Sequence, residues 1–320
     1  MEKDSLEAKL KFIVLGTTDI AINYSRGIRE SGGEVLALFS LKKELLPLNS
    51  LDISEFAAKN NISYHELDDI NSKDSLALMK SYNPEYAFVS WPKLLEKQAL
   101  MVPNEFCIGT HPTDLPYNRG RHPLHWLINL GISDSKVSFF KIDEGVDTGS
   151  ILLKVPFSID KKDTINEVFL KMNESIYNGT KTICEKIKQG NLEKIKQEGL
   201  PNYWRKRNPH DSLIDLRMPY DLISRLVRSY SPPYPCASLV FENNIFPISN
   251  VSTFNSGLSN EELKRLEPGR IISIENKRIR VKVDDVIADL ESTVKIPEDL
   301  KDKKYIFPPS KYLSKYSIEI

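Results

Sequence analysis

The first half of the chain alternates short apolar runs with segments of helical periodicity. Residues 11–16, 34–41 and 86–91 are apolar runs of strand length, and residues 53–60 and 73–82 between them have the periodicity of helices. Buried strands separated by helices are typical of a parallel sheet that is covered by helices on both faces. The sequence therefore predicts an α/β fold with a mostly parallel sheet.

The pattern changes after about residue 195. A long amphipathic helix is predicted for residues 164–189, and the polar, proline-bearing stretch that follows it is typical of a linker. Short strand-like runs with turn residues come next and favour a small β-rich domain. The 320 residues leave room for two domains. We predict a catalytic domain over residues 1–195, a linker over residues 196–212 and a C-terminal β-rich domain over residues 213–320.

The composition argues against several classes of protein. The 44 basic and 44 acidic side chains cancel, whereas nucleic-acid binding draws much of its affinity from the neutralisation of phosphates. No apolar run approaches the ~20 residues of a membrane span, and no zinc spacing or Walker loop is present. The three cysteines lie far apart, as expected of reduced thiols. We expect a cytoplasmic protein without metal, membrane or nucleic-acid partners, and a homodimer is compatible with the sequence.

The densest cluster of unusual residues is HPTDLPYNRGRHPLH, residues 111–125. It holds three of the chain's five histidines, three prolines and two arginines, directly after a predicted strand. The carboxyl ends of parallel strands face the crevice in which open α/β sheets bind ligands. A crossover loop whose histidines satisfy local hydrogen bonds is the alternative. The position of His111 at a strand end favours a functional role.

A second cluster, DEGVDTG at residues 143–149, follows the strand-like run VSFFKI. On its own it predicts a glycine turn with capping aspartates. Since both clusters follow neighbouring predicted strands, we expect His111 and Asp147 to face each other across one crevice. A histidine with a carboxylate partner can accept a proton or stabilise an oxyanion near neutral pH.

The stretches GTHPTDLPYNRGRHPLHW and FKIDEGVDTGSILLK resemble the signature motifs of folate-dependent formyltransferases. Those motifs read roughly N-x-H-x-S-x-L-P-x-x-R-G and D-x-G-x-D-T-G-D. The stretch RKRNPHDSLIDLRMPYDLISRLVRSYSPPYP is similar to the segment that precedes a C-terminal barrel in the longer members. The resemblance implies a Rossmann-like formyltransferase domain with a barrel-like second domain, N10-formyltetrahydrofolate as formyl donor, and an amine as acceptor.

By that resemblance, His111 and Asp147 occupy two of the family's three catalytic positions. The third position, an asparagine in the family, is Gly109 here, and the last aspartate of the second motif is Ser150. Loss of one donor to a developing oxyanion can cost ~10²–10³ in rate. His111 itself or a backbone N–H could supply the donor, with Asn118 or Thr110 as side-chain alternatives, although strand alternation directs Thr110 away from the face of His111. Alternatively, the glycine leaves room for a water or a bulkier acceptor.

The resemblance also implies binding residues. Folate contacts are expected at Val89, Ser90, Trp91, Leu94, Asp143 and Gly145, and acceptor contacts at Thr113, Asn118, Arg119 and Arg121. The two arginines would pair with the phosphates of a nucleotide sugar. Ordinary packing is the alternative for Trp91, and simple solvation is the alternative for Arg121.

The acceptor has to be inferred from other features. The stretch SLKKELLPLNSLDISEF has two lysines against three acids, which is sparse for a tRNA-reading loop, and YNRGRHPLHW is similar to the sugar-nucleotide members. We therefore predict formyl transfer to an amino-sugar nucleotide, which gives an N-formylamino sugar for surface polysaccharide or glycan synthesis. The alternatives are a methionyl-tRNA formyltransferase, a formyltetrahydrofolate hydrolase and a catalytically impaired folate-binding homologue.

Overall fold

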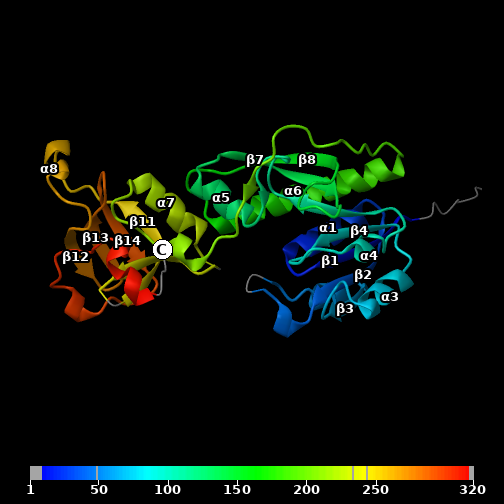
Figure 1. Cartoon of the computed structure of the whole chain (residues 1–320), viewed down its shortest axis with the longest axis horizontal. Coiled ribbons are helices and arrows are strands. Elements are labelled where there is room, and N and C mark those ends of the chain that lie inside the picture. The colour runs from blue at the N-terminus through cyan, green and yellow to red at the C-terminus, as the bar shows by residue number, and fades with distance from the viewer. Residues whose placement is uncertain (1–8, 48–49, 233, 243, 317–320) are drawn as a thin grey trace, which may run out of the picture. The chain divides into compact units, whose positions relative to one another are not determined.

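The computed structural model describes residues 9–47, 50–232, 234–242 and 244–316, and the chain divides into two compact units (Figure 1). The first unit comprises Met1–Pro123, Asp134–Ser158 and Phe169–Arg205. The second unit comprises Leu124–Ser133, Ile159–Val168 and Lys206–Ile320. None of the helices in the described residues is long and apolar enough to cross a membrane.

The first unit is built on a seven-stranded sheet of order β3-β2-β1-β4-β5-β7-β8. Pairing among β1 to β5 is parallel, while β7 runs antiparallel to β5 and β8 antiparallel to β7. The predicted mostly parallel sheet is thereby confirmed. The strand bounds are β1 Lys11–Gly16, β2 Glu34–Leu41, β3 Ser63–Leu67, β4 Tyr86–Ser90, β5 Phe106–His111, β7 Asp134–Lys141 and β8 Ile151–Ser158.

Both faces of this sheet carry apolar side chains, as expected for strands that are apolar throughout. Ile13 and Leu15 join the buried cluster that contains Met79 of α3. On the other face, the ring of Phe88 lies 4.9 Å from the ring of Tyr24 in α1. The helices of the first unit are α1 Asp19–Glu30, η1 Lys43–Leu45, α2 Ser54–Lys59, α3 Lys73–Ser81 and α4 Lys97–Leu100. Of the two helices that follow, α5 Pro123–Asn129 belongs almost entirely to the second unit, and α6 Ile165–Lys188 is divided between the units at residue 168.

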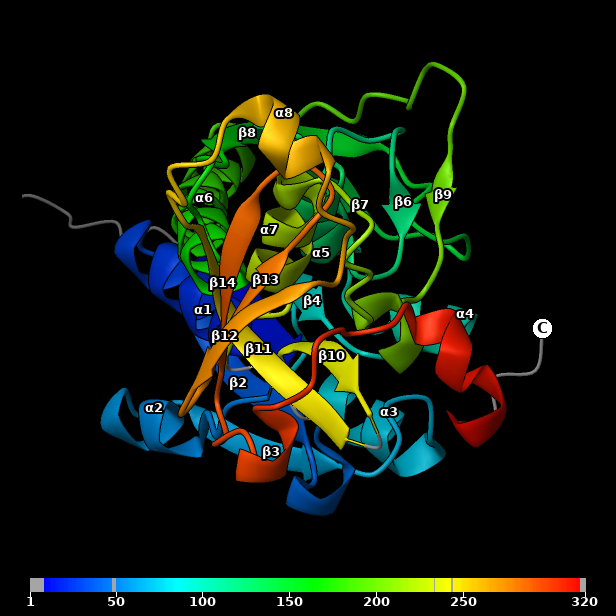
Figure 2. The ribbon, with the colours of Figure 1, turned by 90° about the vertical axis from the view of Figure 1, so that its left-hand side faces the viewer.

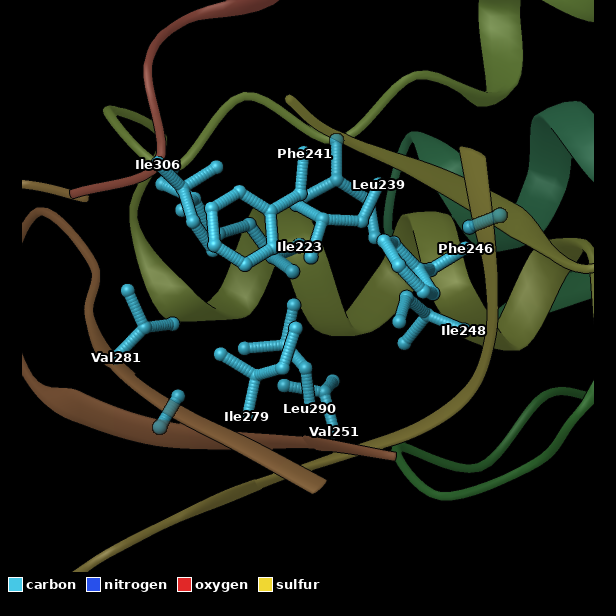
Figure 3. Packing of buried hydrophobic residues seen from close by; sticks show 14 of the residues in the cluster. Ile223, Leu239, Phe241, Phe246, Ile248, Val251, Ile279, Val281, Leu290 and Ile306 are labelled. Carbon is cyan, nitrogen blue, oxygen red and sulfur yellow. The ribbon is translucent and has the colours of Figure 1, made fainter. Parts of the chain in front are cut away.

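The second unit contains a five-stranded antiparallel sheet of order β10-β11-β14-β13-β12, so the predicted β-rich domain is confirmed. Its core packs α7 against the sheet, and Figure 3 shows Ile223 of α7 among Phe241, Ile279 and Leu290. The bounds are η2 Pro209–Ser212, α7 Tyr220–Ser229, β10 Ala237–Phe241, β11 Asn244–Thr253, α8 Asn260–Lys264, β12 Ile271–Glu275, β13 Arg278–Lys282, β14 Ile287–Ser292, η3 Glu298–Leu300 and η4 Pro309–Tyr316.

Candidate active site

His111 is the last residue of β5 and is only 5% exposed. Side chains alternate along a strand, so Gly109 and His111 share one face of the sheet and Thr110 lies on the other. The hydroxyl of Thr110 lies 2.5 Å from the hydroxyl of Tyr24 in α1. Thr110 therefore points away from His111, as strand alternation predicts.

Both nitrogens of the His111 imidazole face an oxygen. Nε2 lies 2.8 Å from the carbonyl oxygen of Asn118, and Nδ1 lies 3.5 Å from Oδ2 of Asp147. A carbonyl oxygen can only accept, so Nε2 carries a proton and donates it to Asn118. His111 and Asp147 meet as expected, and the hydrogen bond from Nε2 to Asn118 fixes the orientation of the ring.

The strand geometry behind this meeting differs from the prediction. β7 runs antiparallel to β5, so Lys141 at its carboxyl end pairs with Ile108, while His111 pairs with Ser138. The expectation that both motifs follow strands ending at one edge is wrong. Asp147 reaches His111 through the loop between β7 and β8.

Asp147 is held in an uncommon backbone conformation, with φ of +55°. Aspartate tolerates the left-handed region better than most residues, but the conformation still needs support from its surroundings. Oδ2 accepts a hydrogen bond of 2.9 Å from the backbone N–H of Gly120. The carbonyl oxygen of Asp147 accepts another, also of 2.9 Å, from Nε2 of Gln197.

Gly120 is positioned by a segment more than eighty residues further along the chain. β6 (Arg119–Gly120) pairs in parallel with β9 (Tyr203–Trp204), and Figure 2 shows the two side by side. Gly120 has φ of +106°, and an added Cβ would lie 2.4 Å from the carbonyl oxygen of Trp204. Only glycine allows this close approach. Residues 196–205, which the sequence placed in a linker, thus lie in the first unit against the candidate site.

The two arginines of the motif lie in different surroundings. Arg119 is 7% exposed, and its guanidinium donates to the hydroxyl of Tyr203 at 2.9 Å and to Oε1 of Gln197 at 2.7 Å. These contacts direct two of its N–H donors to the protein, while its buried Nε has no hydrogen-bond partner among the described residues. Arg121 is exposed, and its backbone N–H donates to the carbonyl oxygen of Trp204 at 3.0 Å.

Thr113 and Asn118 shape the loop that follows β5. Thr113 is fully buried, and its hydroxyl donates to the carbonyl oxygen of Tyr117 at 2.8 Å, so its hydroxyl supports the loop. The Asn118 side-chain oxygen accepts from the Asn202 amide, and the Asn118 backbone N–H donates to the Asn202 side-chain oxygen, both at 2.9 Å. Asn118, whose carbonyl oxygen accepts the hydrogen bond from Nε2 of His111, is therefore itself fixed by Asn202.

The predicted folate residues of β4 and the loop after it vary in exposure. Val89 is 6% exposed and pairs with Gly109 in the sheet, Ser90 is half-buried, and Leu94 is 66% exposed. The indole N–H of Trp91 is buried and has no hydrogen-bond partner among the described residues. Buried polar groups are normally paired, so this donor is available to a ligand.

Asp143 and Gly145 form a local turn between β7 and β8. Oδ1 of Asp143 accepts from the backbone N–H of Gly145 at 3.1 Å and from the hydroxyl of Thr148 at 2.5 Å. Both residues are exposed, and the contacts fit a capped glycine turn. Within the part of the chain that the structure describes, no group of three or more His, Cys, Asp and Glu is placed to hold a metal ion.

The space beside Gly109 is filled by protein. A Cβ added there would lie 3.0 and 3.1 Å from carbons of Ile142 and 3.1 Å from the ring of Phe140. Such contacts are tighter than ordinary van der Waals packing. The expectation that this glycine leaves room for a water or a bulkier acceptor is wrong, because apolar side chains occupy the position.

Sequence patterns did not identify Gln197, Asn202 or Tyr203, which support Asp147, Asn118 and Arg119 respectively. They lie in a polar, proline-bearing stretch without periodicity, and β9 has only two residues. The pair Tyr203–Trp204 in so polar a segment is the one signal that could have indicated packing.

Comparison with known proteins gives a consistent result. A family model described as "Formyl transferase" matches residues 9–183, and one described as "Formyl transferase, C-terminal domain" matches residues 206–302. The chain is 26% identical over 276 residues to a methionyl-tRNA formyltransferase from Pelotomaculum thermopropionicum, covering 82% of this chain and 84% of that relative.

Two solved structures have a similar fold. The methionyl-tRNA formyltransferase from Clostridium thermocellum has a TM-score of 0.58 at 23% identity, covering 78% of this chain and 95% of that chain. The N-formyltransferase from Helicobacter canadensis, solved with folinic acid and dTDP-3-aminofucose, has a TM-score of 0.64 at 16% identity. That match covers 90% of this chain and 100% of the other.

Proposed function

The chain belongs to the formyl transferase family, and we propose that the amine it formylates is the amino group of an amino-sugar nucleotide. The formyl donor of the family is N10-formyltetrahydrofolate. The product would be an N-formylamino sugar, and tetrahydrofolate would be released.

The roles of His111 and Asp147 follow from their contacts. The neutral amine attacks the formyl carbon, and the formyl oxygen becomes an oxyanion. Nε2–H of His111 donates a hydrogen bond to the Asn118 carbonyl oxygen in this structure. In the reaction, the same N–H would donate a hydrogen bond to the oxyanion instead. Asp147, whose Oδ2 lies 3.5 Å from Nδ1 of His111, accepts the proton that the amine loses. Collapse of the intermediate re-forms the carbonyl and breaks the bond from the formyl carbon to N10, which takes up the proton that Asp147 accepted from the amine.

Trp91 is the proposed folate contact that the structure supports best. Its buried indole N–H has no partner in the described residues, and it follows β4, whose Val89 pairs with Gly109. An indole N–H in this position can donate to a polar edge of the bound folate. Leu94, at 66% exposure, would lose contact with water when the folate binds.

The observation that carries the choice of acceptor is the scarcity of free cations after β2. Of the two lysines there, Lys42 pairs with Asp68 at 2.7 Å, and Lys43 is exposed and forms no ion pair with the residues that the structure describes. A protein that binds tRNA needs several cations to neutralise phosphates. Arg121 is exposed and lies next to β6, where it can contact a diphosphate.

A second candidate acceptor is a charged tRNA. It is favoured by the names of the relatives, since the methionyl-tRNA formyltransferase from Pelotomaculum thermopropionicum aligns with 82% of this chain. A hydrolase would release tetrahydrofolate without an added amine. An impaired folate-binding homologue would release none, with or without an amine.

One assay separates these candidates. The purified chain is mixed with N10-formyltetrahydrofolate and, in parallel, with nucleotide-linked amino sugars, with initiator aminoacyl-tRNA or with no amine. Release of tetrahydrofolate and the mass of the acceptor are then measured. We expect formylation of an amino-sugar nucleotide with little change upon Lys43→Ala. Efficient formylation of the tRNA alone, with a steep dependence on salt, would contradict the proposal.

A further inference from the structure

Gln197 lies between the backbone of Asp147 and the guanidinium of Arg119. Its Nε2 donates to the carbonyl oxygens of Asp147 at 2.9 Å and Gly149 at 2.8 Å, and its Oε1 accepts from Arg119 at 2.7 Å. We propose that Gln197 is a positioning residue for formyl transfer. It acts by fixing the turn of residues 147–149, here called the Asp147 turn, so that the Asp147 carboxylate faces His111. Its kinetic consequence rests on the proposed function.

The contacts of Gln197 define which way its amide faces. Arg119 can only donate, and the two backbone carbonyls can only accept, so oxygen must face the arginine and nitrogen must face the turn. Both N–H groups of the amide are then used on the turn. No other orientation of this side chain satisfies all three neighbours, and the three contacts together restrict its motion.

The Asp147 turn needs such a support. Asp147 has a left-handed backbone conformation, and this conformation determines where its carboxylate lies. At the side-chain end, Oδ2 is shared between the N–H of Gly120 at 2.9 Å and Nδ1 of His111 at 3.5 Å. At the backbone end, Gln197 holds the carbonyls on either side of Thr148. Misplacing a catalytic group by about 1 Å can cost about 10²-fold in rate.

Arg119 in turn holds Gln197. Its guanidinium donates to Gln197 and to Tyr203, and lies 5.6 Å from the centre of the Tyr203 ring. Ile195, two residues before Gln197, exchanges two backbone hydrogen bonds with Ile151 at the start of β8. Gln197 is thus anchored by its neighbour in the chain and by Arg119, and can transmit that rigidity to Asp147.

Two substitutions separate positioning from simple packing. Gln197→Glu keeps the shape and the contact with Arg119 but presents an acceptor to the two carbonyls. Gln197→Met keeps most of the volume and adds no charge. We expect both variants to lower kcat about tenfold to a hundredfold with little change in the KM for the folate. Glu198→Gln, at the exposed neighbouring position, is the matched control and should retain the parent kcat.

Combination with Asp147→Asn tests the route of action. If Gln197 acts through Asp147, the Gln197→Met change should cost less than about twofold in the Asp147→Asn background, because the two losses are not independent. Full additivity, or a parent-like kcat in both Gln197 variants, would overturn the proposal.

A second readout does not depend on turnover. The imidazole ¹⁵N signals of His111 should shift in Gln197→Met and Gln197→Glu and stay unchanged in Glu198→Gln. Unchanged signals in all three variants would overturn the positioning role. If the parent chain formylates no acceptor, the proposed function fails, and these signals still decide whether Gln197 positions the pair.

Discussion

β5 and the segment of residues 195–205 serve the same site in different ways. β5 is paired on both sides, with β4 and β7, and places His111 by its position in the sheet. The 195–205 segment has only the two-residue strand β9, and its side chains bind backbone carbonyls and amides of the site loops. His111 thus comes from a strand and Asp147 from the loop between β7 and β8, while the irregular 195–205 segment orients them.

The largest effect should follow from His111→Ala, which removes the proposed proton donor. We expect formyl transfer to fall by about 10³-fold or more, because the tetrahedral intermediate loses its main stabilising group. The variant should stay folded, since His111 is at the end of a strand that is paired on both sides. Single-turnover formylation and thermal unfolding would be measured together.

His65→Ala is the matched control. His65 lies in β3, 2.5 Å from the hydroxyl of Tyr82 and stacked on Phe39, and has no contact with the candidate site in the described residues. Its loss should lower stability and leave kcat almost unchanged. Near-parent turnover by folded His111→Ala would remove His111 from the chemistry.

A smaller loss, roughly 10²-fold in kcat, is expected for Asp147→Asn, because an amide can orient the imidazole but carries no charge beside it. Asparagine tolerates the left-handed backbone, and its side-chain oxygen can still accept from Gly120. The turn should therefore survive, and the loss should report on the chemistry. Turnover within a few-fold of the parent would reduce Asp147 to a turn residue.

Gly109→Asn tests whether the sheet has room for the residue that the family carries. The new side chain would press on Ile142 and Phe140, and overpacking typically costs about 1–3 kcal/mol of stability. We expect the kcat of Gly109→Asn to fall several-fold, to as little as roughly a tenth of the parent value. Urea unfolding and kcat would be measured for Gly109→Asn and Gly109→Ala.

A double variant distinguishes crowding from a missing donor. Ile142→Ala should relieve the contact that Gly109→Asn creates, since Ile142 supplies the nearest carbons. Recovery to the parent kcat would show that crowding caused the loss. A clear gain in turnover with Gly109→Asn alone would show that the natural site lacks a donor and that packing is secondary.

The sequence predicted the parts of this molecule that periodicity encodes. β1 and β2 were located at their observed bounds, because an apolar run of strand length is a local signal. The reversal of β7 was missed, because the direction of a strand within a sheet depends on contacts distant in sequence. His111 and Asp147 were identified because they lie in local sequence motifs. Gln197 was not identified, because its contacts are with residues distant in sequence.

The smallest expected effect belongs to Asn202→Ala, which weakens the support of His111 without touching it. Asn202 exchanges two hydrogen bonds with Asn118, whose carbonyl oxygen accepts from His111. Asn202 is exposed, so water can replace part of what is lost, and each such bond contributes only about 0.5–1.5 kcal/mol. We expect kcat to fall about twofold to fivefold. Asn202→Asp should lie between Asn202→Ala and the parent, because it can still accept from the Asn118 N–H but cannot donate to its side chain. If Asn202→Ala costs as much as Asp147→Asn, the division between β5 and the 195–205 segment is wrong, and the segment takes part in the chemistry directly.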